Sequence, residues 1–558
     1  MYVESKKYPR RQLWRFHGGL HLPDNKQQSL QRPLYQAQLP ERLILPLQQH
    51  IGEITQPLVH VGDRVLKGEK IADSDSPISA PLHAPTSGLV LEIADHPVPH
   101  PSGLAAPCIV IEADGKDTWA ELPPALDDFR AVEPAQLRSR IREAGIVGMG
   151  GATFPSAIKL NPGKPIHTLI LNGAECEPYI TCDDQLMQDF PERVLDGARI
   201  LLHLLGAQEC LIGVEDNKPM AIQALRKHIQ GGEPIEVVRI PTRYPSGGEK
   251  QLIRILTGQE VPSSGFPAQL GMVCHNVATA AAIAQAVLKG RPLISRLVTL
   301  TGEGIAEPRN IEAPLGILAA DLIQQAGGYS DNVSQLILGG PMMGFDLVTD
   351  RIPITKGANC LLAPSEKESP TPMPAQACIR CSRCAEVCPV KLLPQQMYWY
   401  SRAKDLDKVQ DYNLFDCIEC GCCSYVCPSH IPLVQYFRYA KTESWAKEQD
   451  RRDAERAKQR HEFRLARLER LEAERKARLR QKKEALEKKP GTKSNEIDSK
   501  KAAIQAAMQR AAAKKAKQQV QPKNIQDLTQ AQQAQIAEVD KRRAAKTKPS
   551  SQAPADQE

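Results

Sequence analysis

Two copies of one cysteine pattern constrain this chain more than any other feature. The first run is Cys378-x2-Cys381-x2-Cys384-x3-Cys388-Pro389, and the second is Cys417-x2-Cys420-x2-Cys423-x3-Cys427-Pro428. Nine of the fifteen cysteines lie between residues 378 and 427. The first sixteen residues contain charges and a proline but no apolar signal-peptide core, so we expect a reducing compartment. In such a compartment clustered cysteines bind metal rather than form disulfides.

Each run has the spacing found in bacterial ferredoxins, where three thiolates hold one [4Fe–4S] cluster and the fourth holds the other. We therefore predict one cluster on Cys378, Cys381, Cys384 and Cys427, and a second on Cys417, Cys420, Cys423 and Cys388. Cys422 breaks the spacing that Cys423 keeps, so it is not a predicted ligand. Two zinc sites are the alternative, but a duplicated three-plus-one pattern followed by proline is not typical of zinc. A helix over about residues 393–408 is expected between the runs.

The 558 residues predict three or four domains and an unusual tail. Residues 441–558 hold 31 Lys and Arg against 18 Asp and Glu, a net charge of +13, which leaves −6 on the rest of the chain. The composition predicts a charged helix over 450–487 and disorder beyond residue 490. No apolar run approaches the ~18–20 residues that span a bilayer.

Two β-rich segments flank a central α/β segment. Within residues 41–125, two similar halves at 59–65 and 84–90 resemble a lipoyl-like barrel sandwich, but the hairpin at 72–77 has no lysine to carry a prosthetic group, which favours a docking or packing module. Within 296–363, Leu300–Gly304 and Leu315-Gly316 resemble a soluble-ligand-binding β-grasp module. Between them, apolar strands (167–171, 209–214 and 235–240) alternate with helical patterns (192–205, 218–228 and 276–288), which predicts a parallel sheet covered by helices.

Four polar or glycine-rich segments punctuate the α/β segment. Gly148–Pro155 precedes a short helical run with Lys159, and a glycine-rich loop of this kind can place backbone N–H groups against a phosphate. Asn172–Pro178 follows a strand, Tyr244–Lys250 precedes a helix, and Asn276–Thr279 opens another.

In this order the four segments resemble the FMN- and NADH-binding subunit of respiratory complex I. The resemblance implies that FMN is held by Gly148, Gly150, Gly151, Ala152, Lys159, Asn172, Glu175, Asn276 and Thr279, and that Glu249 contacts NADH. Three positions depart from the pattern: Met149 replaces an arginine, Ala174 an aspartate and Gly248 a glutamate. Because of these departures, a non-enzymatic scaffold whose flavin site has decayed stays open as an alternative.

The complete order of modules resembles the RnfC family, whose members belong to the ion-translocating Rnf electron-transport complex. The fold class expected is multidomain α/β plus β, with these parts: an arm (1–40), a barrel sandwich (41–125), a Rossmann-like FMN/NADH domain (126–295), a β-grasp module (296–363), a ferredoxin-type domain with two [4Fe–4S] clusters (366–440) and the tail (441–558). The resemblance implies an NADH:acceptor oxidoreductase subunit and translocase component, peripheral on the cytoplasmic side of the bacterial inner membrane. Its expected partners are the other Rnf subunits and the membrane surface, with no nucleic acid. A soluble NADH dehydrogenase or diaphorase subunit is the alternative enzyme.

Overall fold

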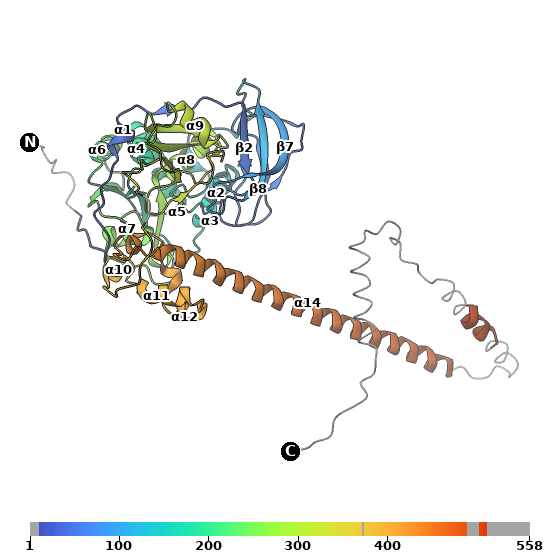
Figure 1. Ribbon diagram of the computed structural model, residues 1–558. Coiled ribbons are helices and arrows are strands. Elements are labelled where there is room, and N and C mark those ends of the chain that lie inside the picture. Colours follow the sequence, from blue (N-terminus) through green and yellow to red (C-terminus); the bar gives the residue numbers. More distant parts are fainter. Residues whose placement is uncertain (1–10, 371–372, 488–501, 511–558) are drawn as a thin grey trace, which may run out of the picture. The chain divides into compact units, whose positions relative to one another are not determined.

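In the computed structural model, two antiparallel sheets build the first β module (Figure 1). One sheet has the order β2-β8-β7-β4, with strands β2 Arg42–Pro46, β8 Ala105–Ala113, β7 Gly88–Pro97 and β4 Arg64–Val65. The other has the order β3-β5-β6, with strands β3 Gln56–Pro57, β5 Lys70–Asp73 and β6 Leu82–His83. Leu45, Ile71, Val90 and Ile109 are fully buried in one apolar cluster of this module. The two faces of the sandwich therefore share a continuous core.

The structure describes residues 11–370, 373–487 and 502–510. The described chain up to Asp450 forms one compact unit, and a second unit begins at Arg451. The predictions for residues 1–10 and for most of the tail beyond residue 490 lie outside the described residues.

The central module is a four-stranded, fully parallel sheet with the order β11-β10-β9-β12. Its strands are β9 Thr168–Gly173, β10 Glu209–Glu215, β11 Ile235–Ile240 and β12 Met272–Asn276. The accompanying helices are α2 Pro134–Glu143, α3 Ser156–Lys159, α4 Cys182–Asp189, α5 Pro191–Leu205, α6 Pro219–His228, α7 Glu249–Thr257 and α8 Val277–Lys289. The predicted parallel sheet is present because each apolar strand is followed by an amphipathic helix that returns the chain to the same end.

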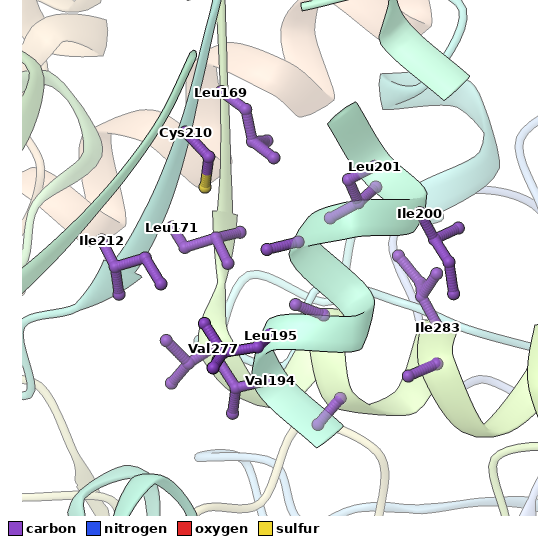
Figure 2. Close-up of a cluster of buried hydrophobic side chains, with 14 of the residues drawn as sticks. Leu169, Leu171, Val194, Leu195, Ile200, Leu201, Cys210, Ile212, Val277 and Ile283 are labelled. Atoms are coloured by element: carbon purple, nitrogen blue, oxygen red, sulfur yellow. The ribbon is translucent and has the colours of Figure 1, made fainter. Parts of the chain in front are cut away.

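The largest core cluster lies between this sheet and helices α5 and α8. Figure 2 shows Leu169 and Leu171 of β9 beside Leu195 and Leu201 of α5. Gly197 of α5 allows the two helices to approach closely, since a Cβ atom there would clash with the backbone carbonyl of Ala280 in α8. The sheet is thereby anchored on one face, which fixes where its carboxyl edge lies.

A mixed six-stranded sheet follows, with the order β1-β14-β13-β17-β15-β16. Its strands are β1 Tyr35–Gln36, β13 Ser295–Thr301, β14 Arg309–Pro314, β15 Ile337–Leu338, β16 Phe345–Asp346 and β17 Cys360–Leu362, and helix α9 Ala319–Gln325 follows β14.

Residues 11–36, which belong to the predicted N-terminal arm, pair with later parts of the chain. Trp14 donates a backbone hydrogen bond to Ile255, and Gly19 donates one to Val387. After helix α1 Gln27–Leu30, Tyr35 pairs with Ile311 as the edge strand of the mixed sheet. This N-terminal segment, residues 11–36, is therefore ordered by backbone pairing with three later parts of the chain.

The cysteine-rich module is built from short helices, α10 Arg383–Glu386, α11 Pro394–Arg402, α12 Leu406–Asp411 and α13 Cys422–Tyr425, and from the start of the long helix α14 Leu433–Glu487. The single helix predicted over 393–408 is wrong, because Lys404 has a left-handed backbone (φ 58°) and Asp405 caps a new helix. Helix α14 begins well before the predicted residue 450. Residues 502–510 are helical, where disorder was predicted.

Candidate flavin site and metal centres

The glycine loop is closed by its own backbone. Gly148 donates to the Phe154 carbonyl at 2.8 Å, and Thr153 donates to the Gly148 carbonyl at 3.1 Å. Gly151 has φ 104°, and a Cβ atom placed there would meet nothing within 4 Å. The crown of the loop thus leaves open space beside bare backbone, which fits the close approach of a phosphate.

The loop lies against the start of helix α8. The Met149 backbone N–H donates to Thr279 Oγ1 at 2.9 Å, and a Cβ atom on Gly150 would lie 3.4 Å from Asn276 Cβ. Asn276 is the N-cap of α8, where its Oδ1 accepts from Ala278 at 2.8 Å and from Thr279 at 3.4 Å. Three predicted flavin residues, Gly150, Asn276 and Thr279, are therefore brought together.

Asn172 joins this group through the sheet. Asn172, the penultimate residue of β9, lies directly opposite Asn276 of β12 in the parallel register. The sheet order β11-β10-β9-β12 places β10 and β12 on opposite sides of β9, so the strand order reverses at β9. Ligands of open α/β sheets bind outside the carboxyl ends of the strands at such a switch point. Asn172 Nδ2 also donates to the Gly247 carbonyl at 2.8 Å, which holds the third segment at the same edge.

Lys159 and Glu249 form an ion pair at 2.5 Å. Lys159 ends helix α3 and Glu249 begins α7, and their side chains are 32% and 39% exposed. Exposed pairs of this kind contribute little to stability, about 0–1 kcal/mol, so a ligand phosphate can compete for the lysine. The predicted phosphate and dinucleotide residues are thus direct neighbours.

Glu175 is buried at the N-terminus of α4 rather than beside the glycine loop. Its carboxylate accepts from the Asp183 backbone N–H at 2.9 Å and from Asp184 at 3.4 Å. Burial raises its pKa, an effect that the nearby Lys26 and Lys218 oppose. Asp183 in turn accepts from Asn276 Nδ2 at 2.6 Å, so Glu175 reaches the site through Asp183 and Asn276. Ala152 follows Gly151 in the loop crown.

Three groups at this edge were missed by sequence reasoning. His275 precedes Asn276, and its buried Nε2 has no hydrogen-bond partner among the described residues, while burial and the Lys159 charge lower its pKa to about 3. Such an orphaned nitrogen fits a site that receives a polar ligand. Lys218, which follows β10, and Glu215, its last residue, form a fully buried ion pair at 2.7 Å. Arg296 of β13 donates to the Met149 carbonyl at 3.2 Å. Of these groups, only His275 could have been found from the sequence, because it lies next to Asn276, a predicted flavin residue.

The eight predicted cluster cysteines gather into the two predicted sets. One small cavity is lined by Cys378, Cys381, Cys384 and Cys427, and the other by Cys388, Cys417, Cys420 and Cys423. None of the eight forms a disulfide. Cys422 is fully buried and also lines the second cavity. Four converging sulfurs of this kind fit a cubane cluster.

The backbone between the cysteines adopts the same left-handed conformation in both runs. Arg380 and Ser382 in the first run, and Glu419 and Gly421 in the second, have positive φ angles of 58°, 62°, 57° and 78°. Non-glycine residues adopt this conformation only where their surroundings impose it. The repeated conformation turns each loop inward, so that its sulfurs converge on one cavity.

The second cysteine set touches the α/β module. Tyr244, which is 3% exposed, donates through its hydroxyl to the Cys420 carbonyl at 2.7 Å. Glu177 Oε1 accepts from the backbone of Met342 at 2.7 Å, and the Met342 carbonyl lies against Gly421. Cys381 of the first set is exposed. The loops that follow β9 and β11 therefore lead from the predicted flavin site to Cys420.

Four family models match the chain in the order of its modules. They are an RnfC barrel sandwich hybrid domain over residues 14–116, a Nuo51 FMN-binding domain over 141–285, an SLBB domain over 297–346 and a 4Fe-4S dicluster domain over 377–431. The chain is 51% identical over 406 residues to the C-subunit of the ion-translocating oxidoreductase complex of Pseudomonas aeruginosa, an alignment that covers 72% of this chain and 52% of that protein. It is 48% identical over 506 residues to the C-subunit of the same complex in Vibrio cholerae serotype O1, covering 90% of this chain and 65% of that protein.

The chain belongs to the RnfC family. It spans about half to two thirds of the length of the curated RnfC relatives that it matches. The matches confirm the predicted barrel-sandwich, FMN-binding, SLBB and dicluster modules, and with them FMN and iron–sulfur clusters as the cofactors. The individual binding residues stay predictions.

Two further observations bear on this RnfC chain. An NAD+-reducing [NiFe]-hydrogenase in the H2-reduced state aligns with a TM-score of 0.41 and 19% identity over 53% of this chain and 60% of that chain, a similarity too low to support any statement about function. Among the helices that the structure describes, none has the length and apolar character needed to cross a membrane.

Proposed function

We propose that this chain is a peripheral electron-transfer subunit of an ion-translocating oxidoreductase complex, passing electrons between NADH, FMN, two [4Fe–4S] clusters and membrane partner subunits. The observation that carries the proposal is the hydrogen bond from Tyr244 to Cys420, which joins the flavin edge of the sheet to the second cysteine set. When bound, FMN takes up two electrons together and releases them singly to one-electron clusters.

The residues at the sheet edge would divide the binding of FMN among them. The open crown of Gly150, Gly151 and Ala152 would accept the phosphate with its backbone N–H groups, and Lys159 would neutralise its charge. Asn172 and Asn276 already hold the Gly247 segment and the α8 N-terminus in place, which keeps the site preorganised.

Glu249 is the residue we assign to the dinucleotide. It begins α7 at the rim of the site and is 39% exposed, so it is within reach of a second ligand. Glu249 pairs with Lys159. When the FMN phosphate takes its place beside the lysine, the Glu249 carboxylate would be released to contact the dinucleotide.

The eight cysteines would hold the clusters as one set of Cys378, Cys381, Cys384 and Cys427 and one set of Cys417, Cys420, Cys423 and Cys388. We further propose a β-grasp fold for the SLBB module, the cytoplasmic side of the bacterial inner membrane as the location, and the other Rnf subunits and the membrane surface as partners. The names of the relatives, which place them in an ion-translocating oxidoreductase complex, support a place in such a complex.

Anaerobic purification with joint measurement of iron, acid-labile sulfide and FMN tests the proposal. We expect about eight irons, from two cubanes, and one FMN per chain, and bleaching of the flavin by NADH in stopped flow. Clusters without flavin would instead support the scaffold, and full activity with no association with membranes in cells would support the soluble diaphorase.

A further inference from the structure

A cavity of about 510 Å³ lies where the barrel sandwich, the α/β module and the mixed sheet meet. Its walls include Trp119 from the first module, Ala282 of α8 and Leu297 of β13. Small-molecule sites have volumes of about 300–1,000 Å³ and occur preferentially at domain interfaces. The size and place of this cavity are therefore those of a ligand site.

The cavity runs along one face of α8. Ala278, Ala281, Ala282 and Gln285 line it at helical spacing, and Arg291 lines it beyond the C-terminus of the helix. At 1.5 Å per residue, the helical part of this face, from Ala278 to Gln285, is about 10 Å long. Three of these four helical residues are alanines, so the face has room for a planar group to lie against it.

Cationic side chains lie toward both ends. At the start of α8, Arg296 is 3% exposed and donates to the backbone carbonyls of Met149 and Lys356. At the far end, the exposed Arg291 lies 5.6 Å from the centroid of the Trp119 ring. Within the part of the chain that the structure describes, Arg291 has no hydrogen bond or ion pair with a carboxylate, and Arg296 has none either, although it is near enough to Asp183 for the two charges to attract each other.

The acidic side chains of the cavity are held by other groups. Asp117 pairs with Lys67 at 2.5 Å, Asp183 accepts from Asn276 at 2.6 Å, and Glu312 accepts from Ser295 at 3.0 Å. Arg193, stacked 3.9 Å from the Phe190 ring, adds a further cation to the lining. The cavity therefore offers guanidinium groups to an anion, and guanidinium geometry matches phosphate.

This cavity is separate from the predicted flavin site. Met149 belongs to both neighbourhoods, but Gly150, Lys159, Asn172 and Glu249 do not line the cavity. Met149 turns its backbone N–H to Thr279 and its carbonyl to Arg296, so the glycine loop forms a thin partition between the two.

We propose that the cavity is a second ligand site, for a nucleoside diphosphate. The base would lie on the alanine face of α8 and the phosphates would meet the arginines. Because Arg296 contacts the glycine loop, a ligand bound in this cavity would affect the glycine loop of the predicted flavin site. The proposal does not depend on the assignment of the flavin residues.

The test is a titration of ADP into the full chain, purified anaerobically with its cofactors, by calorimetry. We expect saturable binding of one ADP with FMN retained. Ala282→Phe, which fills the middle of the cavity, should abolish binding, and Arg291→Ala should weaken it roughly tenfold or more, as expected for loss of a charge-assisted contact. Lys289→Ala removes an exposed cation of the same helix outside the cavity and should leave binding unchanged.

Arg291 is exposed, so Arg291→Ala decides the matter even if Ala282→Phe does not fold. The proposal is overturned if the chain shows no saturable binding up to about 1 mM ADP, a weak-binding limit of about 4 kcal/mol. It is also overturned if Arg291→Ala binds ADP as tightly as the unchanged chain. Loss of ADP binding in Glu249→Ala would place ADP in the dinucleotide site, and displacement of FMN by ADP would place it in the flavin site, so either result overturns the proposal as well.

Discussion

The Tyr244 hydroxyl and the Cys420 carbonyl are joined by a 2.7 Å hydrogen bond that links the flavin edge of the parallel sheet to a predicted cluster loop. We expect Tyr244→Phe to leave that buried carbonyl without its partner and to lower the free energy of unfolding by about 1–3 kcal/mol. Because the Cys420 loop loses its anchor, iron should also be lost faster to a chelator. Tyr179→Phe, which removes a partly buried hydroxyl that donates to Glu368 rather than to a cluster loop, is the control and should keep the native rate of iron loss.

The cysteine sets predict a pattern of iron loss. Cys381→Ser and Cys420→Ser should each remove about half of the iron and sulfide, because each cubane needs four thiolates. Cys422→Ser should keep nearly all of it, although Cys422 lines the second cavity. Iron loss in Cys422→Ser as large as in Cys420→Ser would show that the ligand assignment is wrong.

Substitutions of Lys159 and Glu249, which form an ion pair, should distinguish flavin binding from dinucleotide binding. Lys159→Ala should release FMN, since the phosphate loses its countercharge, and flavin fluorescence of the filtrate measures the release. Glu249→Ala should retain FMN and slow bleaching by NADH in stopped flow. Retention of FMN by Lys159→Ala would contradict the assignment of the phosphate site.

Lys356 makes stability depend on pH. It is 1% exposed, donates to the carbonyls of Pro81 and Gly145 at 2.7 Å each, and burial lowers its pKa from 10.5 to about 7. Between about pH 7 and 10.5 the unfolded chain binds the extra proton, so this group makes stability rise with pH across that window. The test is therefore to measure the denaturation midpoint at pH 7 and at pH 9.5. The increase in the midpoint between the two pH values should be smaller in Lys356→Met than in the native chain. A matched change at the exposed Lys447 should have no such effect.

The tail can be removed only beyond the first turns of α14. Lys441 donates to the Cys417 carbonyl and to Glu419 at 2.7 Å each, so truncation after Ala440 deletes an anchor of the second cysteine loop. We expect that truncation to lose part of the iron, whereas truncation after Asp450 should keep the absorbance of both clusters and of FMN. Loss of either cofactor on the longer truncation would give the tail a structural role.

Most of what could be predicted came from local patterns in the sequence. Strand and helix alternation and the two cysteine sets follow from the spacing of apolar residues and thiols along the chain. What escaped prediction depends on distant contacts or single backbone angles. The reach of Arg296 from β13 to the glycine loop has no signal near either residue, and the break at Lys404 depends on one left-handed residue inside an otherwise helical pattern.

The N-terminal segment, residues 11–36, has a consequence for the order in which the protein matures. It is synthesised before its backbone partners, which include Ile255, Ile311 and Val387. Contacts of such long sequence separation form late and slowly. The segment cannot complete its pairing until the cysteine-rich module has been synthesised, so closure of the three modules upon one another is a late event, coincident with the stage at which cofactors can enter.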